Sequence, residues 1–190
     1  MEKILIVSGE AGAQQLKDIL TGAGFTAPKI VSSASEVRQM ALKADFDLIL
    51  INMPLRDETG KELAFDLADD TNSAVLTLVA NGREEIIGSF GRNKGIQMIT
   101  KPVNRKQFLD SVSFMLSSRR KLKKVLQKNA ELTKALADMK AVSKAKCLLI
   151  ANSQLTEAEA HRYIEKQAMD QQLTKGQIAE RIIAADGIIS

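Results

Sequence analysis

The first 118 residues alternate between short apolar runs and amphipathic segments. The apolar runs have the length of strands and cover residues 3–7, 29–31, 46–51, 74–79 and 96–99. The segments between and after them, 14–20, 35–44, 60–67, 84–90 and 104–116, read as helices. Apolar strands that alternate with helices indicate a parallel sheet covered on both faces. We therefore expect an α/β domain with five parallel strands and a site beyond their carboxyl ends.

A long helix is predicted next, because residues 104–150 contain neither proline nor glycine. Within it, residues repeat in heptads and form a seam suited to a coiled coil. The seam consists of Leu122, Val125, Asn129, Leu132, Leu136 and Met139. Asn129 can pair with its copy across a parallel dimer, which fixes the register of the two helices. We expect a parallel homodimer; the alternative is a single helix that packs on its own N-terminal domain with Asn129 exposed.

The C-terminal segment carries two helix starts. Thr156 is followed three residues later by Glu159, which fits a capping box. Thr174 is a second and weaker candidate cap, because Gly176 follows it closely. Apolar residues recur at helical spacing after each cap, so we expect two short amphipathic helices behind the long one.

The composition excludes several classes of protein. No apolar run is long enough to cross a bilayer, and the N-terminus lacks the pattern of a signal peptide. The single cysteine, Cys147, has no partner for an internal disulfide or for a metal site, and we expect it to be a small buried hydrophobe. These features favour a cytoplasmic protein that does not associate with membranes.

The positive charge of the chain is concentrated in its middle. The formal net charge is +4, but residues 117–146 hold ten basic residues against two acidic ones, a net of +8. The segments on either side each have a net charge of −2. This basic stretch is either a solvated helix face or a surface that attracts a polyanion.

The C-terminal segment resembles the ANTAR domain, the RNA-binding module of bacterial transcription antitermination regulators. The resemblance lies in Ala145, Lys146, Leu148, Leu155 to Ala160, Arg162, Ile164, Gln167 to Asp170, Ala179, Ile182 and Ile183. The sequence departs from the family pattern at Cys147, Ile150, Gln171, Gln172 and Lys175. The alternative is a DNA-binding response regulator with a C-terminal helix-turn-helix, for which residues 173–182 are a partial match.

The first domain resembles the receiver domain of two-component response regulators, which has a flavodoxin-like five-stranded fold. The stretch from Asn52 to Gly60 (NMPLRDETG) and the pair Lys101-Pro102 carry this resemblance. A phosphorylatable receiver needs an aspartate nucleophile, an acidic pair that holds a divalent cation, a hydroxyl and a lysine. The corresponding positions here form a degenerate phosphoacceptor pocket made of Ser8, Gly9, Asn52, Val79 and Lys101. We therefore expect a pseudo-receiver with no catalytic activity, metal or cofactor; the alternative is a receiver that still phosphorylates itself.

These patterns combine into one hypothesis: a two-component-type transcription regulator with a pseudo-receiver at 1–118, a coiled coil at 119–143 and an ANTAR domain at 144–190. The resemblance implies that a dimer binds two hairpins of a nascent leader RNA and prevents transcription termination. Candidate RNA contacts are Lys144, Lys146, Arg162, Lys166, Gln171 and Gln172, whereas the spacing of Tyr163 favours core packing. Without phosphorylation, a regulatory protein partner is one candidate for the switch.

Overall fold

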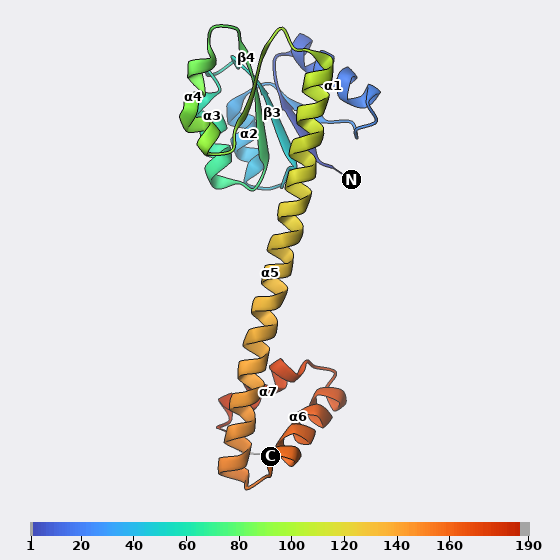
Figure 1. The fold of residues 1–190 in the computed structure, drawn as a ribbon, viewed down its shortest axis with the longest axis vertical. Coiled ribbons are helices and arrows are strands. Elements are labelled where there is room, and N and C mark those ends of the chain that lie inside the picture. Colours follow the sequence, from blue (N-terminus) through green and yellow to red (C-terminus); the bar gives the residue numbers. More distant parts are fainter. Residues whose placement is uncertain (1, 187–190) are drawn as a thin grey trace. The chain divides into compact units, whose positions relative to one another are not determined.

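The computed structural model describes residues 2–186, without the side chains of Ser89 and Phe90, and the chain divides into two compact units (Figure 1). The first unit is Met1–Leu122 and the second is Lys123–Ser190. Residue 1 of the expected pseudo-receiver and residues 187–190 of the expected ANTAR domain lie outside the described residues.

The first unit contains one five-stranded parallel sheet. Its strands are β1 (Ile4–Val7), β2 (Lys29–Val31), β3 (Leu48–Asn52), β4 (Ala74–Ala80) and β5 (Gln97–Lys101). Their order in the sheet is β2-β1-β3-β4-β5, and every neighbouring pair is parallel. The central strands β1 and β3 are buried almost throughout, as expected for a sheet covered on both faces. The predicted fold class is confirmed.

Helices cover both faces of this sheet. They are α1 (Glu10–Gly22), α2 (Ala34–Ala41), α3 (Lys61–Asp70), the short 3-10 helix η1 (Glu84–Ile86), α4 (Gly88–Asn93) and the start of α5 (Arg105–Ser153). Leu16 of α1 and Phe108 of α5 belong to the hydrophobic core on one face. Val37 of α2 and Leu63 of α3 belong to the core on the other face. The two faces therefore have separate cores, with the sheet between them.

The observed helices differ from the expected segments at several places. The expected helix at 84–90 is divided into the 3-10 helix η1 and the helix α4, which begins only at Gly88. Helix α1 begins at Glu10, directly behind Gly9, and is thus longer than the predicted segment. Helix α2 begins at Ala34, one residue before the expected segment, and is capped by Ser33, whose hydroxyl accepts the backbone N–H of Glu36. Asp57 supplies a second, distant cap, since its carboxylate accepts the backbone N–H groups of Ala34 and Ser35. That contact joins residues far apart in sequence, which a local pattern does not reveal.

Helix α5 is continuous over 49 residues, as its lack of proline and glycine predicts. It begins behind Asn104, whose side-chain oxygen accepts the backbone N–H of Gln107. The apolar members of the heptad seam are exposed over more than half of their surface, from 52% at Leu122 to 69% at Met139. Asn129 is exposed as well. The protein therefore displays an unpaired apolar seam on α5, and the homodimer stays a prediction.

The second unit is a three-helix arrangement of the end of α5 with α6 (Glu157–Asp170) and α7 (Lys175–Ala184). Its small core contains Ala145, Leu149, Ala160, Ile164, Ala168, Ile178 and Ala179. Tyr163 is half-buried and packs against this core, which confirms its expected role. Cys147 is exposed, so the expectation of a buried thiol is wrong. It lies between the core positions Ala145 and Leu149 of α5, and its side chain is on the side of the helix that faces away from the core.

Both predicted helix starts in this unit are capping boxes. Thr156 and Glu159 exchange side-chain and backbone hydrogen bonds, which confirms the first. Thr174 does the same with Gln177, so the second cap is stronger than the sequence indicates. The nearby Gly176 has a packing role: a Cβ there would lie 2.3 Å from Asp138 Oδ1. Glycine thus lets the first turn of α7 lie directly against α5.

Candidate functional site

Two places in the structure gather the residues singled out in the sequence. The first is the carboxyl edge of the sheet, where β1, β3, β4 and β5 end. Asn52 at the end of β3 donates its side-chain N–H to Ser8 Oγ over 2.8 Å, and Ser8 Oγ donates to the carbonyl of Gly9. Val79 is fully buried in β4 and offers no hydroxyl. The structure thus brings the predicted pocket residues to one edge, as an amide–hydroxyl pair and not as a cluster of carboxylates.

This edge does not fit a magnesium ion. Mg²⁺ prefers carboxylate and water oxygens in octahedral geometry. Ser8 and Asn52 are neutral, and residues 2–186 contain no group of three His, Cys, Asp or Glu side chains that could hold a metal. Helix α1 also approaches closely, because a Cβ at Gly12 would lie 2.5 Å from Asn52 Nδ2. The side chains present therefore do not supply the ligand set that the receiver family would use.

Lys101 is the one predicted pocket residue that carries a charge. Its ammonium group donates to the backbone carbonyl of Met53 over 2.6 Å and is half-buried. Burial lowers the pKa of Lys101, because desolvation disfavours the charged form. The peptide bonds from Lys101 to Pro102 and from Met53 to Pro54 are both cis.

The second place is the surface of the three-helix unit. Lys146 at the end of α5 donates to Glu157 Oε1 over 2.9 Å, and only 24% of its side chain is exposed. This ion pair lowers the pKa of Glu157, chiefly through the hydrogen bond from Lys146. Lys146 therefore links α5 to the first turn of α6 in addition to any contact with a ligand.

The other candidate RNA contacts are exposed. Lys144, Arg162 and Lys166 have no carboxylate within ion-pair distance among the described residues. Gln171 is held at the end of α6, where it donates to Gln167 and accepts from Arg181 Nη1 over 2.6 Å. Gln172 follows in a left-handed backbone conformation with φ of +55°. Four of these polar side chains therefore lie on α6 or at its C-terminal turn, whereas Lys144 lies on α5.

Two residues near these contacts were missed in the sequence. Arg181 of α7 reaches Gln171, although ten positions separate them. Met169 is 80% exposed at the end of α6. It lies seven residues after Arg162 and three after Lys166, which is the helical spacing of one face. That spacing could have placed Met169 beside the two cations, but an apolar residue near Ala168 reads as core.

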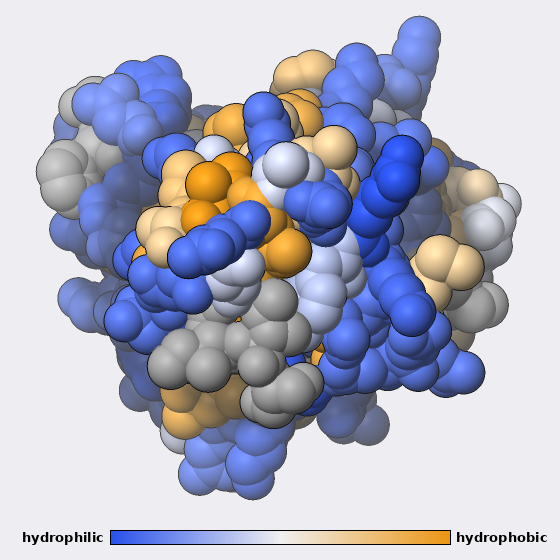
Figure 2. Space-filling view, turned by 90° about the horizontal axis from the view of Figure 1, so that it is seen from below, coloured by the Kyte–Doolittle hydropathy of each residue, from blue (hydrophilic) through white to orange (hydrophobic). Residues whose placement is uncertain are grey.

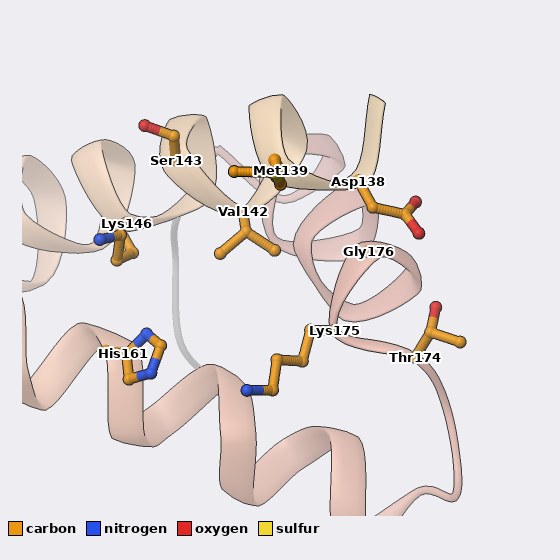
Figure 3. A pocket seen from close by; sticks show the side chains of 9 residues that line it. All are labelled: Asp138, Met139, Val142, Ser143, Lys146, His161, Thr174, Lys175 and Gly176. Carbon is orange, nitrogen blue, oxygen red and sulfur yellow. The ribbon is translucent and has the colours of Figure 1, made fainter. Parts of the chain in front are cut away.

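A cavity of about 460 Å³ lies within the second unit between the three helices. It is lined by Asp138, Met139, Val142, Ser143, Lys146, His161, Thr174, Lys175 and Gly176 (Figure 3). Val142 points from α5 into the space between α5 and α6, and Lys175 extends across it toward His161 (Figure 3). Glu165 accepts from Lys175 and lies 3.3 Å from His161 Nε2, and Lys175 is the main cause of its lowered pKa.

Figure 2, seen from below, shows a mainly hydrophilic face, with hydrophobic residues gathered near the centre of the view and others scattered around it. No helix within residues 2–186 combines the length and the apolar character that a membrane span needs.

Comparisons with known proteins agree with this arrangement. Residues 130–183 match the family model of the ANTAR domain. The transcriptional regulatory protein PdtaR of Mycobacterium tuberculosis is 22% identical over 186 residues, which cover 97% of this chain and 91% of that protein. The match to the ANTAR family model favours the ANTAR interpretation over the helix-turn-helix alternative. It begins at residue 130, upstream of the predicted domain boundary at residue 144.

Several solved structures similar to this chain are receiver domains. The receiver domain of the TMAO respiratory system response regulator TorR superposes with a TM-score of 0.54 at 24% identity, over 62% of this chain and 98% of that one. A CheY-like response regulator receiver domain protein from Methanospirillum hungatei gives 0.56 at 25% identity, over 64% and 98%. The chain therefore combines a receiver-like fold with a C-terminal segment that matches the ANTAR domain.

Proposed function

We propose that the protein is a transcription antitermination regulator that binds hairpins of nascent leader RNA through its second unit. The observation that carries the proposal is the set of exposed cations without ion-pair partners in the segment that matches the ANTAR domain, namely Lys144, Arg162 and Lys166. Unpaired exposed cations are suited to phosphate contacts, because no internal bond has to break first.

The remaining candidates divide by chemistry. Gln171 and Gln172 carry amides that can donate to and accept from the edges of unstacked loop bases. Lys146 has a different position, because its ammonium already bonds to Glu157 and must share its protons with a phosphate. We therefore expect Arg162 and Lys166 to contribute more to affinity than Lys146.

We propose further that the protein acts as a parallel homodimer through the seam of α5. The five apolar seam residues are exposed in the single chain, and contact with a second copy would remove that apolar surface from water. Asn129 on the same seam would pair with its copy. A dimer presents two ANTAR domains, which suits an RNA with two hairpins.

The receiver-fold unit is proposed to lack phosphotransfer. Asn52 offers an amide where an acyl phosphate requires a carboxylate, and Ser8 and Gly9 replace the acidic pair. Incubation with acetyl phosphate and Mg²⁺ is expected to leave the mass of the protein unchanged. A gain of one phosphoryl group would contradict this part of the proposal.

The experiment that tests the function measures binding of the full chain to a labelled two-hairpin leader RNA. Arg162→Ala and Lys166→Ala should each weaken binding about fivefold to tenfold and reduce the salt slope by about one unit. Lys43→Ala, an exposed lysine of the first unit, is the matched control and should bind normally. Unchanged affinity in both α6 variants would refute the proposed interface.

The dimer is tested separately by sedimentation. Leu132→Asp places a charge in the seam and should convert the dimer to a monomer, whereas Lys134→Asp, which is not a seam position, should not. A wild-type chain that sediments as a monomer at concentrations where it binds RNA would contradict the dimer.

A further inference from the structure

A second cavity, of about 310 Å³, lies at the carboxyl edge of the sheet in the first unit. It opens between α1 and the segment that follows β5. Its polar lining comes from Gln15, Asn52 and Lys101, and apolar lining comes from Leu16, Ile19 and Val103. The volume is near the lower end of the range for small-molecule sites, so a ligand of this cavity would be small.

Lys101 gives the cavity an unbalanced charge. Its ammonium group makes one hydrogen bond, to the neutral carbonyl of Met53, and can donate two more. No carboxylate among residues 2–186 forms an ion pair with it. A half-buried cation without an anion is costly, and the lowered pKa of Lys101 expresses that cost. A bound anion would complete the coordination of this group.

The other walls of the cavity select among anions. Leu16 and Ile19 lie one turn apart on α1, and with Val103 they form an apolar part of the lining. A hydrated inorganic anion gains nothing from such a wall, whereas a hydrocarbon chain buries apolar surface against it. The Gln15 amide offers an additional N–H to an acceptor on the ligand.

We propose that this cavity binds a small aliphatic carboxylate. The carboxylate pairs with the Lys101 ammonium, and the hydrocarbon chain lies against Leu16, Ile19 and Val103. The site uses the lysine of the former phosphoacceptor pocket, but it needs neither an aspartate nor a metal. The inference concerns the first unit alone and does not depend on RNA binding.

The test is a calorimetric titration of the full chain with hexanoate. Three probes accompany it: hexylamine, which has the opposite charge, hexanol, which has none, and inorganic phosphate, which has no chain. We expect saturable binding of hexanoate that is at least about tenfold tighter than that of any of the three, because only hexanoate satisfies both the charge and the apolar wall.

Variants locate the binding. Lys101→Met keeps the length of the side chain, removes the charge and should weaken hexanoate binding about tenfold or more. Val103→Phe should fill the cavity and abolish binding while Lys101 remains. Lys43→Met is the matched control on the exposed surface and should bind as the wild type does.

Three results would overturn the proposal. They are the absence of hexanoate binding to the wild type at millimolar concentration, equal binding of hexanoate and phosphate, and unchanged binding in Val103→Phe. Circular dichroism of each variant checks that the sheet is folded, and Val103→Phe decides the question if Lys101→Met does not fold.

Discussion

The contact between α5 and α7 at Gly176 leads to a sharp prediction about stability. Gly176→Ala adds a methyl group that would lie 2.3 Å from Asp138 Oδ1, 2.5 Å from its Cγ and 3.0 Å from its Cβ. Rotation of the carboxylate can relieve the first two contacts, but the third involves an atom fixed to the backbone of α5. Helix α7 must therefore move away from α5.

Two effects of opposite sign determine how much Gly176→Ala changes the free energy of unfolding. Alanine is favoured over glycine within helices by about 1 kcal/mol, and less in a first turn. Overpacking of a close contact costs about 1–3 kcal/mol. The packing cost is larger, so we expect Gly176→Ala to destabilise the second unit by about 1–2 kcal/mol. Helix propensity alone predicts that Gly176→Ala makes the second unit more stable.

The chain offers a convenient probe for this measurement. It contains no tryptophan and a single tyrosine, Tyr163, which packs against the core of the second unit. Tyrosine fluorescence during urea unfolding therefore reports on this unit alone. The free energy of unfolding of the wild type and of Gly176→Ala can be compared without interference from the first unit.

A double-mutant cycle identifies the cause. Asp138→Gly removes both the carboxylate and the Cβ that a methyl group at residue 176 would meet, so Gly176→Ala should cost at least about 1 kcal/mol less in that background. An increase in stability on Gly176→Ala in the wild-type background, or equal costs in the two backgrounds, would refute the close contact between Gly176 and Asp138.

Two other predictions concern the same unit and use the same fluorescence. Thr156→Ala removes the hydroxyl that accepts the backbone N–H of Glu159, leaves the backbone N–H of residue 156 bonded to the Glu159 carboxylate, and should cost about 1 kcal/mol. Thr156→Ser is a control that keeps the hydroxyl, and an unchanged midpoint in Thr156→Ala would show that this hydroxyl contributes nothing. Lys146 and Lys175 lower the pKa values of Glu157 and Glu165, respectively. The two ion pairs therefore stabilise the folded unit fully above the ordinary carboxyl pKa near 4.5, and this stabilisation is lost as the pH falls through the lowered pKa values. The unit should therefore weaken below about pH 4.5, less so in Glu157→Gln, and a stability that is flat down to pH 3 would contradict the ion pairs.

Much of the fold is predictable because its signals are local. Apolar runs of strand length give all five strands, and Thr156 with Glu159 gives the start of α6. The continuity of α5 is predicted by the absence of helix-breaking residues from 104 to 150. In each case neighbouring residues determine the outcome through periodicity or capping, so no knowledge of the tertiary structure is needed.

The errors arise where a distant residue decides. Asp57 adds a distant cap to α2 across 23 positions, beside the local cap from Ser33. In the sequence, Gly176 indicates a weak helix start, but its packing role depends on Asp138 of another helix. Lys101 was recognised as a remnant of a phosphoacceptor pocket, whereas the cavity that it lines depends on how α1 lies over the sheet.

The most direct test of the central claim compares nucleic acids. The full chain is titrated with a two-hairpin leader RNA and with a DNA duplex of equal length, over a series of salt concentrations, because phosphate contacts alone produce steep and equal salt dependence. We predict RNA binding that remains at salt concentrations where DNA binding is lost. Equal affinity for both at every salt concentration would mean that only the positive charge of the chain attracts nucleic acid, and it would contradict a specific RNA-binding function.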